Sequence, residues 1–562
     1  MIDYLLATVA KAHARHVLRG FLRATRRAAR TQTRVLMGKI RRNVESDFGR
    51  EHKFGAIRTY ADFAERVPIL RYDDLAPYVE RVRNGALNAL FGPKQKVLMF
   101  AMSSGTTDRP KYVPVTEAFL KEYRRGWNAF GVKALSDHPR AFLRPIVQVT
   151  SRMDEETAPS GVPCGAITGL MAAMQKRIVR KYYASVPCVA RIEDAATRYY
   201  TIMRLAAAVN VGFMITANPA TQLKLARTGD SRKEQIIRDV HDGTLDPGLD
   251  VPADVRAELA PRLKARPKRA KALEEVVRQT GRLLPKDMWD LGFVANWTGG
   301  TMGLYLRDFP EYFGKTPVRD IGLLASEGRM SIPLEDGTPC GVLDVTSNFY
   351  EFIPVSEYES AQPTVLLPHD LEVGQDYYIL LTTSAGFYRY DIADVVRVHG
   401  FYGQAPIIEF LNKGAHISSL TGEKLAESQV VLAVERACTC LGIEPGLFVL
   451  APQWAESPYY RLYIEPPDAS ADELAALERE MESALGHVNI EYAGKRNSGR
   501  LGPVRLSVLP AGFLAERDLR LATRHRKANE QFKHQYLLPS PGEDKDFPRG
   551  EPVRPASVPA SE

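Results

Sequence analysis

Hydroxyl side chains gather around a glycine in one short segment of the chain. Its residues, together with the lysine that follows, are Ser103, Ser104, Gly105, Thr106, Thr107 and Lys111. Because the apolar run 97–102 comes directly before them, we expect a loop that leaves a β-strand. Such a loop offers hydroxyl and backbone donors to phosphate oxygens, and the lysine supplies a point charge. The same residues also occur in plain turns, and the spacing of a Walker phosphate loop is absent from this segment.

Two acidic side chains further along the chain could complete a nucleotide site. Glu327 stands before Gly328 in an expected loop, where its carboxylate could hold Mg²⁺ through oxygen. Asp394 ends the segment 386–394 just before an apolar strand, a position suited to accept hydrogen bonds from ribose hydroxyls. Each also has an ordinary interpretation: an exposed glutamate in a turn, and an aspartate that caps a turn or helix.

The composition is that of a globular protein, since 45% of the 562 residues are hydrophobic and 25% are charged. The length indicates roughly two to four folding units. No apolar run reaches the roughly 18 residues of a membrane-spanning helix, and the amino-terminal residues do not have the pattern of a secretory signal. The five scattered cysteines are typical of a reducing compartment, so we expect a cytoplasmic protein without a compact zinc site.

The pattern of apolar residues favours an α/β fold. Residues 1–90 are mainly helical in this interpretation, with a turn expected at 47–49. Short β-rich runs separated by helical stretches follow from Lys96, and the region 340–411 is dense in apolar β runs. The basic cluster 264–269 is expected to be an exposed helix junction rather than a nucleic-acid site, because no aromatic side chains alternate with its charges.

A smaller α+β unit is expected after Gly414. Its helices would cover 423–440 and a stretch opened by Ser470, with Glu473 completing a capping box. Residues 541–562 are rich in proline, serine and charge, and they are predicted to form a disordered tail.

Positive charge is concentrated in the first 42 residues, although the net charge of the whole chain is only +8. The cations that share this segment with the single acid Asp3 include Lys11, Arg15, Arg19, Arg23, Arg26, Arg27 and Arg30. One interpretation is a helix that binds a membrane or a nucleic acid. The other, which we favour, is a solvated helix docked through apolar residues such as Val17 and Leu22.

Three motifs in order resemble those of the adenylate-forming superfamily, which includes acyl-CoA synthetases, peptide-synthetase adenylation domains and luciferases. They are SSGTTDRPK at 103–111, LLASE at 323–327 and GFYRYDIAD at 386–394. The finer resemblance is to the auxin-responsive acyl acid–amido synthetases, the Gretchen Hagen family. It extends through TGGTMGLY and GFYGQAPIIEFLNKGAHISSLTGEKLAE and covers about residues 35 to 540.

The resemblance implies roles for particular residues. The triphosphate would be held by Ser103, Ser104, Gly105, Thr106, Thr107 and Lys111. The adenosine would be bound by Thr298, Gly299, Gly300, Thr301, Ser326 and Asp394. Glu327 would bind Mg²⁺, and Lys533 would reach the acyl-phosphate region during adenylation. Asn412 and Lys413 stand where the superfamily has its interdomain hinge.

The implied fold is a large, multi-subdomain amino-terminal domain with β-sheets flanked by helices, plus a small mobile α+β domain. We expect the large domain at 1–412 and the lid domain at 413–540. One departure from the family pattern concerns Ala393, which replaces the glycine before Asp394 and would demand an ordinary backbone conformation there. The others are Leu323 and Leu324 in place of a tyrosine beside the adenine, and His534 after Lys533.

The resemblance implies an ATP- and Mg²⁺-dependent ligase that makes an acyl-adenylate and transfers the acyl group to an amine, releasing pyrophosphate and AMP. The expected partners are a small carboxylic acid and an amino acid, with no nucleic acid, and the expected state is a monomer. A ligase that makes an acyl-CoA thioester shares the same adenylation motifs. An alternative of another class is a membrane- or nucleic-acid-associated binding protein that acts through the basic amino-terminal helix.

Overall fold

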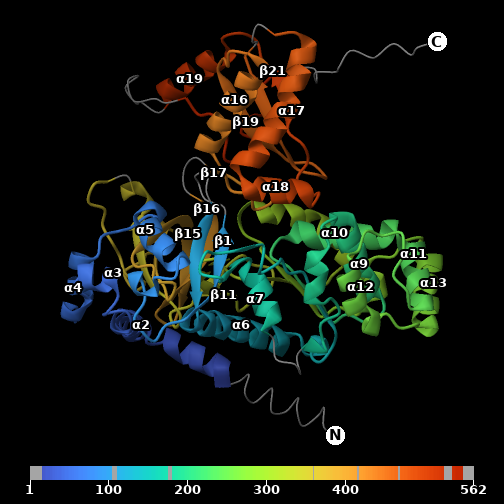
Figure 1. Ribbon diagram of the computed structural model, residues 1–562, viewed down its shortest axis with the longest axis horizontal. Coiled ribbons are helices and arrows are strands. Elements are labelled where there is room, and N and C mark those ends of the chain that lie inside the picture. The colour runs from blue at the N-terminus through green and yellow to red at the C-terminus, as the bar shows by residue number, and fades with distance from the viewer. Residues whose placement is uncertain are drawn as a thin grey trace. The chain divides into compact units, whose positions relative to one another are not determined.

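The structure is a computed structural model, and it describes residues 16–103, 110–174, 180–358, 360–413, 417–465, 469–524 and 534–548 (Figure 1). The chain divides into two compact units. The first comprises residues 1–103 and 111–412, and the second comprises 104–110 and 413–562. The division falls between Asn412 and Lys413, where the sequence predicts a hinge, and hinge motion itself stays a prediction.

The amino-terminal part of the first unit is helical, as predicted. After helical residues 16–25 come α2 (Ala28–Arg42), α3 (Asp47–Glu51), α4 (Tyr60–Arg66) and α5 (Tyr72–Arg83). The expected turn at 47–49 is wrong, because α3 occupies it. The side chain of Ser46 accepts a hydrogen bond from the backbone nitrogen of Gly49, and Asp47 lies in the first turn, where an acid favours a helix start.

A six-stranded sheet forms the centre of the first unit and confirms the β-rich region 340–411. Its strands are β11 (Ser331–Ile332), β12 (Gly341–Leu343), β13 (Phe349–Pro354), β14 (Asp376–Thr382), β15 (Tyr390–Tyr402) and β16 (Ala405–Lys413), in the order β11-β12-β16-β15-β14-β13. Side chains such as Ile379, Leu381 and Val396 are fully buried in the core of this unit. The helices α2 and α4 pack on the same core through Leu36 and Phe63.

Two four-stranded sheets complete the first unit. One contains β1 (Val97–Ser103), β2 (Lys111–Thr116), β4 (Glu156–Thr157) and β5 (Pro163–Gly165), in the order β2-β1-β5-β4. The other contains β3 (Ile146–Gln148), β6 (Phe213–Ile215), β7 (Phe293–Asn296) and β8 (Val318–Asp320), in that order and all parallel. The carboxyl ends of four parallel strands therefore meet at one edge, the usual place for ligands in α/β sheets.

Helices surround these sheets (Figure 1). They are α6 (Glu117–Asp137), α7 (Ile167–Ala173), α9 (Ala195–Ala207), α10 (Pro219–Ser231), α11 (Lys233–Asp242), α12 (Ala253–Leu259), α13 (Pro267–Thr280), α14 (Pro285–Met288) and α15 (Phe309–Phe313). The helix junction predicted at Pro267 is confirmed, since α13 begins there. Of the helices in the described part of the chain, none is both long enough and apolar enough to cross a membrane.

The second unit is an α+β domain with its own core. Its elements are β17 (Ile417–Ser418), β18 (Leu425–Ala426), α16 (Glu427–Leu441), β19 (Phe448–Gln453), β20 (Tyr459–Ile464), α17 (Ala471–Val488), α18 (Ile490–Asn497), β21 (Arg505–Val508) and α19 (Phe513–Arg524). The capping box of Ser470 and Glu473 at the start of α17 is confirmed. The helix predicted over 423–440 begins only at Glu427, because Leu425 and Ala426 pair with β17 instead.

Part of the predicted tail is packed in this domain. Phe547 is buried against the rings of Tyr463 and Phe513. Asp544 accepts hydrogen bonds from the Tyr463 hydroxyl at 2.6 Å and the Gln453 amide at 2.5 Å. The prediction of disorder is therefore wrong for residues 541–548. Their composition is polar, but the ring of Phe547 and the carboxylate of Asp544 are buried. Residues 549–562 lie outside the described residues.

Candidate functional site

The hydroxyl-rich segment connects two antiparallel strands. Ser103 at the end of β1 pairs with Lys111 at the start of β2. Lys111 Nζ lies 5.3 Å from the ring centre of Tyr72, and the Tyr72 hydroxyl accepts a hydrogen bond from the Tyr112 backbone nitrogen at 2.7 Å. The base of the loop is thus fixed on β2 and α5. Residues Ser104, Gly105, Thr106 and Thr107 lie outside the described residues, as does the side chain of Ser103.

Glu327 lies at the tip of a short hairpin. Ser326 and Glu327 are the two turn residues between β9 (Leu324–Ala325) and β10 (Gly328–Arg329). A Cβ at Gly328 would lie 2.6 Å from Asn348 Nδ2, so only glycine fits this close approach. The Arg329 carbonyl accepts a hydrogen bond from the Tyr350 hydroxyl at 3.0 Å, which anchors the hairpin to the central sheet.

The Glu327 carboxylate is buried, with 5% of the residue exposed. Its Oε1 lies 3.5 Å from the Tyr390 hydroxyl, at the limit of a hydrogen bond. Among the described residues, no lysine, arginine or histidine forms an ion pair with it. Buried carboxylates are normally paired with a cation or bound to a metal. The residue therefore fits a divalent cation, which its hard oxygen donors would suit.

The charge of Glu327 affects the pKa values of two tyrosines, Tyr72 and Tyr390. Burial raises the pKa of Tyr72 to about 12, and the Glu327 charge adds to the rise. Burial also raises the pKa of Tyr390 well above its usual value, with further contributions from the charges of Glu327 and Asp394. Lys111, which lies over the Tyr72 ring, completes the group. Glu327 thus lies beside the Tyr390 hydroxyl and Lys111 lies over the Tyr72 ring, and the charges of Glu327 and Asp394 act on these two neutral phenols.

Asp394 is the last residue of a bulge in β15. Tyr378 of β14 pairs with Val395 and Leu380 pairs with Asp391, so the three residues from Ile392 to Asp394 lie opposite a single residue. Ala393, in the middle, has a φ of 57° and donates its backbone N–H to Asp391 Oδ1 at 2.8 Å. The expectation of an ordinary backbone at Ala393 is therefore wrong. The bulge demands the left-handed conformation, and bulges of this kind redirect a side chain at functional sites.

Ala393→Gly should be tolerated. The left-handed conformation costs an alanine about 1–2 kcal/mol, whereas a glycine increases the entropy of the unfolded chain by about 0.4–1 kcal/mol. We expect a free energy of unfolding in urea equal to that of the unmodified protein or up to about 1 kcal/mol higher. The β-branched change Ala393→Val should lower it instead. A loss of stability in Ala393→Gly greater than about 1 kcal/mol would contradict the assignment.

The turn predicted to contact adenine leaves the carboxyl end of β7. Its Thr298 donates two hydrogen bonds of 2.7 Å, from the backbone nitrogen and from Oγ1, to Asp320 Oδ2 at the end of β8. The other carboxylate oxygen accepts from the Gly322 backbone nitrogen at 2.5 Å. A Cβ at Gly299 would lie 3.2 Å from the Phe410 carbonyl oxygen, so the turn packs closely against β16. Asp320 therefore positions this turn at the edge where the parallel strands end.

Asp320 should make stability depend on pH. Burial raises its pKa to about 6 from an ordinary value near 4. The folded state thus binds a proton more tightly than the unfolded chain, so the stabilisation is fully present below about pH 4 and is lost as the pH rises through about 6. Relative to Asp320→Asn, the unmodified protein should gain about 1 kcal/mol of unfolding free energy between about pH 7.5 and pH 5, measured by urea titration. An unchanged difference would contradict the raised pKa.

The remaining predicted residues are only partly described. Ser326 is half-buried on its turn. Gly300 and Thr301 begin a 3₁₀ helix (Gly300–Asp308), and Asn412 and Lys413 end β16, but their side chains lie outside the described residues. Lys533 also lies outside them, and the roles of all these residues stay predictions.

One further cluster could hold a metal. Cys340, His399 and Glu409 present ligand atoms within 4.8 Å of one another, and His399 Nε2 lies 2.6 Å from Glu409 Oε2. Cys340 directly follows Pro339, which packs against Gly299. The spacing of these three residues along the chain gave no sign of the cluster, because three separate segments of the central sheet bring them together.

Sequence reasoning assigned no role to three residues that shape the site, although one of them, Tyr390, lies within the motif 386–394. The Tyr390 hydroxyl lies 3.5 Å from Glu327 Oε1, the charge of Glu327 contributes to the raised pKa of Tyr72, and Asp320 holds the adenine turn. Asp320 could have been found, because an acid at the carboxyl end of a parallel strand is a typical ligand-site signal. The tyrosines gave no such signal, since a tyrosine in an apolar run is usually a core residue.

Most of the chain matches the three domain models of one family. Residues 17–318 match the GH3 family N-terminal domain, 341–413 the GH3 family central domain and 428–541 the GH3 family C-terminal domain. The protein therefore belongs to the GH3 family, the family that the sequence motifs resemble.

Relatives and solved structures agree with this assignment. The chain is 25% identical to indole-3-acetic acid-amido synthetase GH3.8 of Oryza sativa subsp. indica, over 86% of this chain and 84% of that protein. It is 22% identical to jasmonoyl–L-amino acid synthetase JAR4 of Nicotiana attenuata, over 88% and 89% of the two chains. The structure of the GH3.15 acyl acid amido synthetase superposes with a TM-score of 0.63 over 92% of each chain at 19% identity, which shows a shared fold.

Proposed function

We propose that this protein activates a small carboxylic acid with ATP to form an acyl-adenylate, and then joins the acyl group to the amine of an amino acid. The observation that carries the proposal is the buried carboxylate of Glu327, which has no cationic partner among the described residues and lies beside the Tyr390 hydroxyl. Membership in the GH3 family supports the same reaction, because the relatives named above are amido synthetases.

The first step converts the carboxylate, whose oxygen is a poor leaving group, into an acyl-adenylate, from which AMP is a good leaving group. An oxygen of the substrate carboxylate attacks the α-phosphorus of ATP, the bond to the β,γ-phosphates breaks, and pyrophosphate leaves. The product is a mixed anhydride of the acid and AMP. Glu327 would hold Mg²⁺, which when bound would stabilise the charge on the phosphate oxygens as a Lewis acid. Lys111 contributes a second positive charge, and the hydroxyl-rich loop contributes hydrogen-bond donors.

The second step forms the amide. The amine nitrogen attacks the acyl carbon, the bond from that carbon to the AMP oxygen breaks, and the nitrogen gives up a proton to solvent or to a base. No covalent bond to the enzyme is needed in either step. Asp394 is proposed to hold the ribose through its hydroxyl groups, and the turn at Thr298 and Gly299, fixed by Asp320, to lie against the adenine.

The organisation of the chain is part of the proposal. We assign the ATP and acyl-acid sites to residues 1–412 and a lid function to 413–540, with a hinge at Asn412 and Lys413 and with Lys533 near the acyl phosphate. A lid has a physical purpose in this chemistry, because water hydrolyses an acyl-adenylate and must be excluded until the amine arrives.

Product analysis by mass spectrometry tests the proposal. The protein would be incubated with ATP, Mg²⁺, a panel of aryl, indole and aliphatic acids, and either pooled amino acids or coenzyme A. We expect an amide and AMP with one or more acids, and only when amino acids are present. A thioester with coenzyme A but no amide would assign the chain to the acyl-CoA ligases instead.

A further inference from the structure

A row of arginines follows one face of the amino-terminal helices. Arg23, Arg27, Arg30 and Arg34 are exposed. Arg23 lies in the helical residues 16–25, Arg27 lies in the turn before α2, and Arg30 and Arg34 are one helical turn apart on α2. Among the described residues, none of these four side chains forms an ion pair or a hydrogen bond. Like charges at this spacing repel, so a bound anion would relieve the repulsion.

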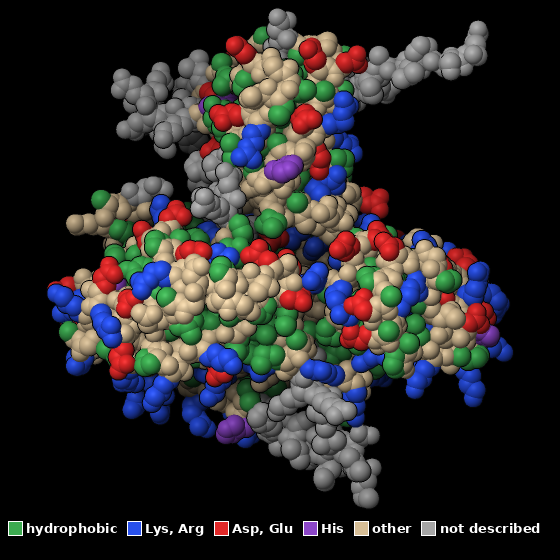
Figure 2. All heavy atoms as spheres, in the orientation of Figure 1, with side chains coloured by type: hydrophobic (Ala, Val, Ile, Leu, Met, Phe, Trp, Pro, Cys, Tyr) green, Lys and Arg blue, Asp and Glu red, His purple; other side chains and the backbone are tan. Residues whose placement is uncertain are grey.

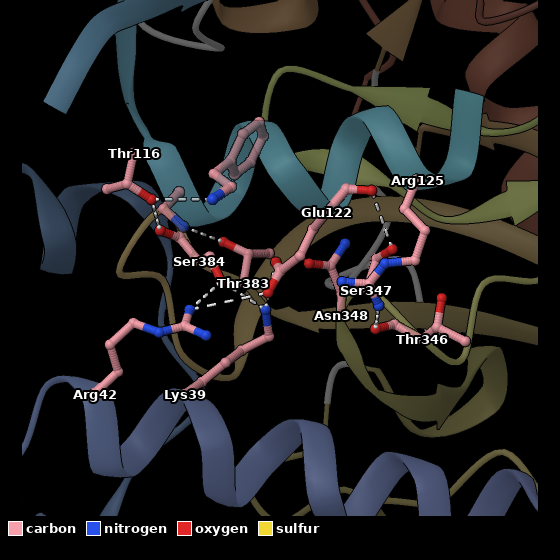
Figure 3. Close-up of polar contacts among 12 residues, drawn as sticks. Lys39, Arg42, Thr116, Glu122, Arg125, Thr346, Ser347, Asn348, Thr383 and Ser384 are labelled. Atoms are coloured by element: carbon pink, nitrogen blue, oxygen red, sulfur yellow. Dashed lines mark hydrogen bonds and ion pairs between the residues drawn. The ribbon is translucent and has the colours of Figure 1, made fainter. Parts of the chain in front are cut away.

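The row lines a groove of about 550 Å³ that Arg42 and Arg125 also line. Figure 3 shows the floor of this groove, where Lys39 of α2 points at Glu122 of α6. Lys39 Nζ donates hydrogen bonds of 2.9 Å to Glu122 Oε2 and to Ser384 Oγ. Among the described residues that line the groove, one is acidic, Glu122, and it already forms an ion pair with the buried Lys39. The exposed arginines are therefore left uncompensated, and Figure 2 shows Lys and Arg side chains along the edge of the molecule where α2 lies.

An apolar hollow adjoins the groove. It has a volume of about 500 Å³ and shares Arg125 with the groove. Its apolar lining residues are Val17, Leu98, Leu120 and Met174, and the polar side chains that complete the lining are Glu117, Lys121, Arg124, Arg125 and Asn128. Met174 is 42% exposed, one of few large apolar side chains so exposed in the described part of the chain. A ligand that has both an anionic group and an apolar segment would place the first in the groove and the second in the hollow.

We propose that this groove and hollow form a docking surface for an anionic phospholipid bilayer, with lipid phosphates on the arginine row and acyl chains against the apolar hollow. Basic side chains near a surface and a neighbouring apolar patch are the two features that peripheral membrane contact requires. A nucleic acid fits less well, because none of the described lining residues of the groove is aromatic and bases would find no stacking surface. The surface is independent of the proposed amide synthesis, since it contains no residue of the candidate site.

Vesicle co-sedimentation of the full-length protein tests this surface. Vesicles of phosphatidylcholine alone would be compared with vesicles that also contain phosphatidylglycerol. We expect binding only to the anionic vesicles, and a loss of about tenfold or more in the variant that combines Arg23→Gln, Arg27→Gln, Arg30→Gln and Arg34→Gln. The substitution Met174→Glu should also weaken binding, because it places a charge in the apolar hollow.

A matched control removes the same charge elsewhere. Four exposed cations lie around the start of α13 and form no side-chain hydrogen bond or ion pair among the described residues: Lys264, Arg266, Lys268 and Lys271. Changing all four to glutamine should leave vesicle binding within about threefold. Thermal melting and amide synthesis confirm that each variant is folded. The proposal is overturned if the anionic vesicles do not bind, or if the control variant loses as much binding as the arginine variant. It is also overturned if Met174→Glu binds normally while tripolyphosphate or single-stranded DNA displaces the vesicles, which would indicate a site for soluble polyanions.

Discussion

Glu327→Gln is expected to lower the rate of pyrophosphate release by about 10²- to 10³-fold while the protein stays folded. The carboxylate is buried at the tip of a two-residue turn and lacks a cationic partner among the described residues. An amide of the same shape keeps the packing but gives up the charge that a divalent cation needs. Without ligands, the variant should melt at the same temperature as the unmodified protein or higher, because an uncompensated buried charge destabilises the folded state.

Magnesium dependence separates this role from a structural one. Mg²⁺ should increase the melting-temperature shift that ATP causes in the unmodified protein, and it should have little effect in Glu327→Gln. Glu335→Gln is the matched control, because Glu335 is an exposed glutamate a few residues further along the chain. Full activity in Glu327→Gln would remove Glu327 from the metal site. A large fall in its melting temperature would indicate a role in folding.

Asp394→Asn should raise the KM for ATP about 10- to 100-fold and change kcat less. A hydrogen bond to a charged group contributes about 1.5–3 kcal/mol, which corresponds to this range. Asp394 is 3% exposed at the end of the bulge around Ala393. Burial raises the pKa of Tyr390, and the charges of Glu327 and Asp394 add to the rise. Steady-state kinetics with varied ATP at saturating acid measure the effect.

The ribose assignment can be tested with 2′-deoxy-ATP. The unmodified protein should discriminate against this analogue, and Asp394→Asn should discriminate much less, because the partner of the missing hydroxyl has changed. Asp376→Asn is the control, because it changes a carboxylate on the neighbouring strand β14 that pairs with Arg397 at the surface. This variant should discriminate against 2′-deoxy-ATP as strongly as the unmodified protein does. Equal discrimination in Asp394→Asn and the unmodified protein would show that Asp394 does not bind the ribose.

The sequence allowed the fold class and the family to be predicted, because both rest on signals that are local in the chain. Apolar runs predicted the strands of the region 340–411, and Ser470 with Glu473 predicted the start of α17. The motifs around Glu327 and Asp394 predicted residues that the structure brings close to the same tyrosine, Tyr390.

The features that the sequence did not predict depend on contacts between distant segments. Ala393 adopts a left-handed conformation because β14 and β15 are paired in two registers, and no single-strand pattern shows a change of register. Asp320 becomes a positioning residue only when β7 and β8 lie side by side. The burial of Phe547 could not be predicted either, since its polar neighbours are typical of a disordered segment.

Exchange of labelled pyrophosphate into ATP tests the central claim, the formation of an acyl-adenylate, most directly. The reaction would contain ATP, Mg²⁺ and the carboxylic acid identified by product analysis, with no amine. Because adenylation is reversible until the acyl group is transferred, we predict exchange that depends on the acid and is lost in Glu327→Gln. Amide formation without any such exchange would contradict the account, since it would show that the acid is activated by a route other than its adenylate.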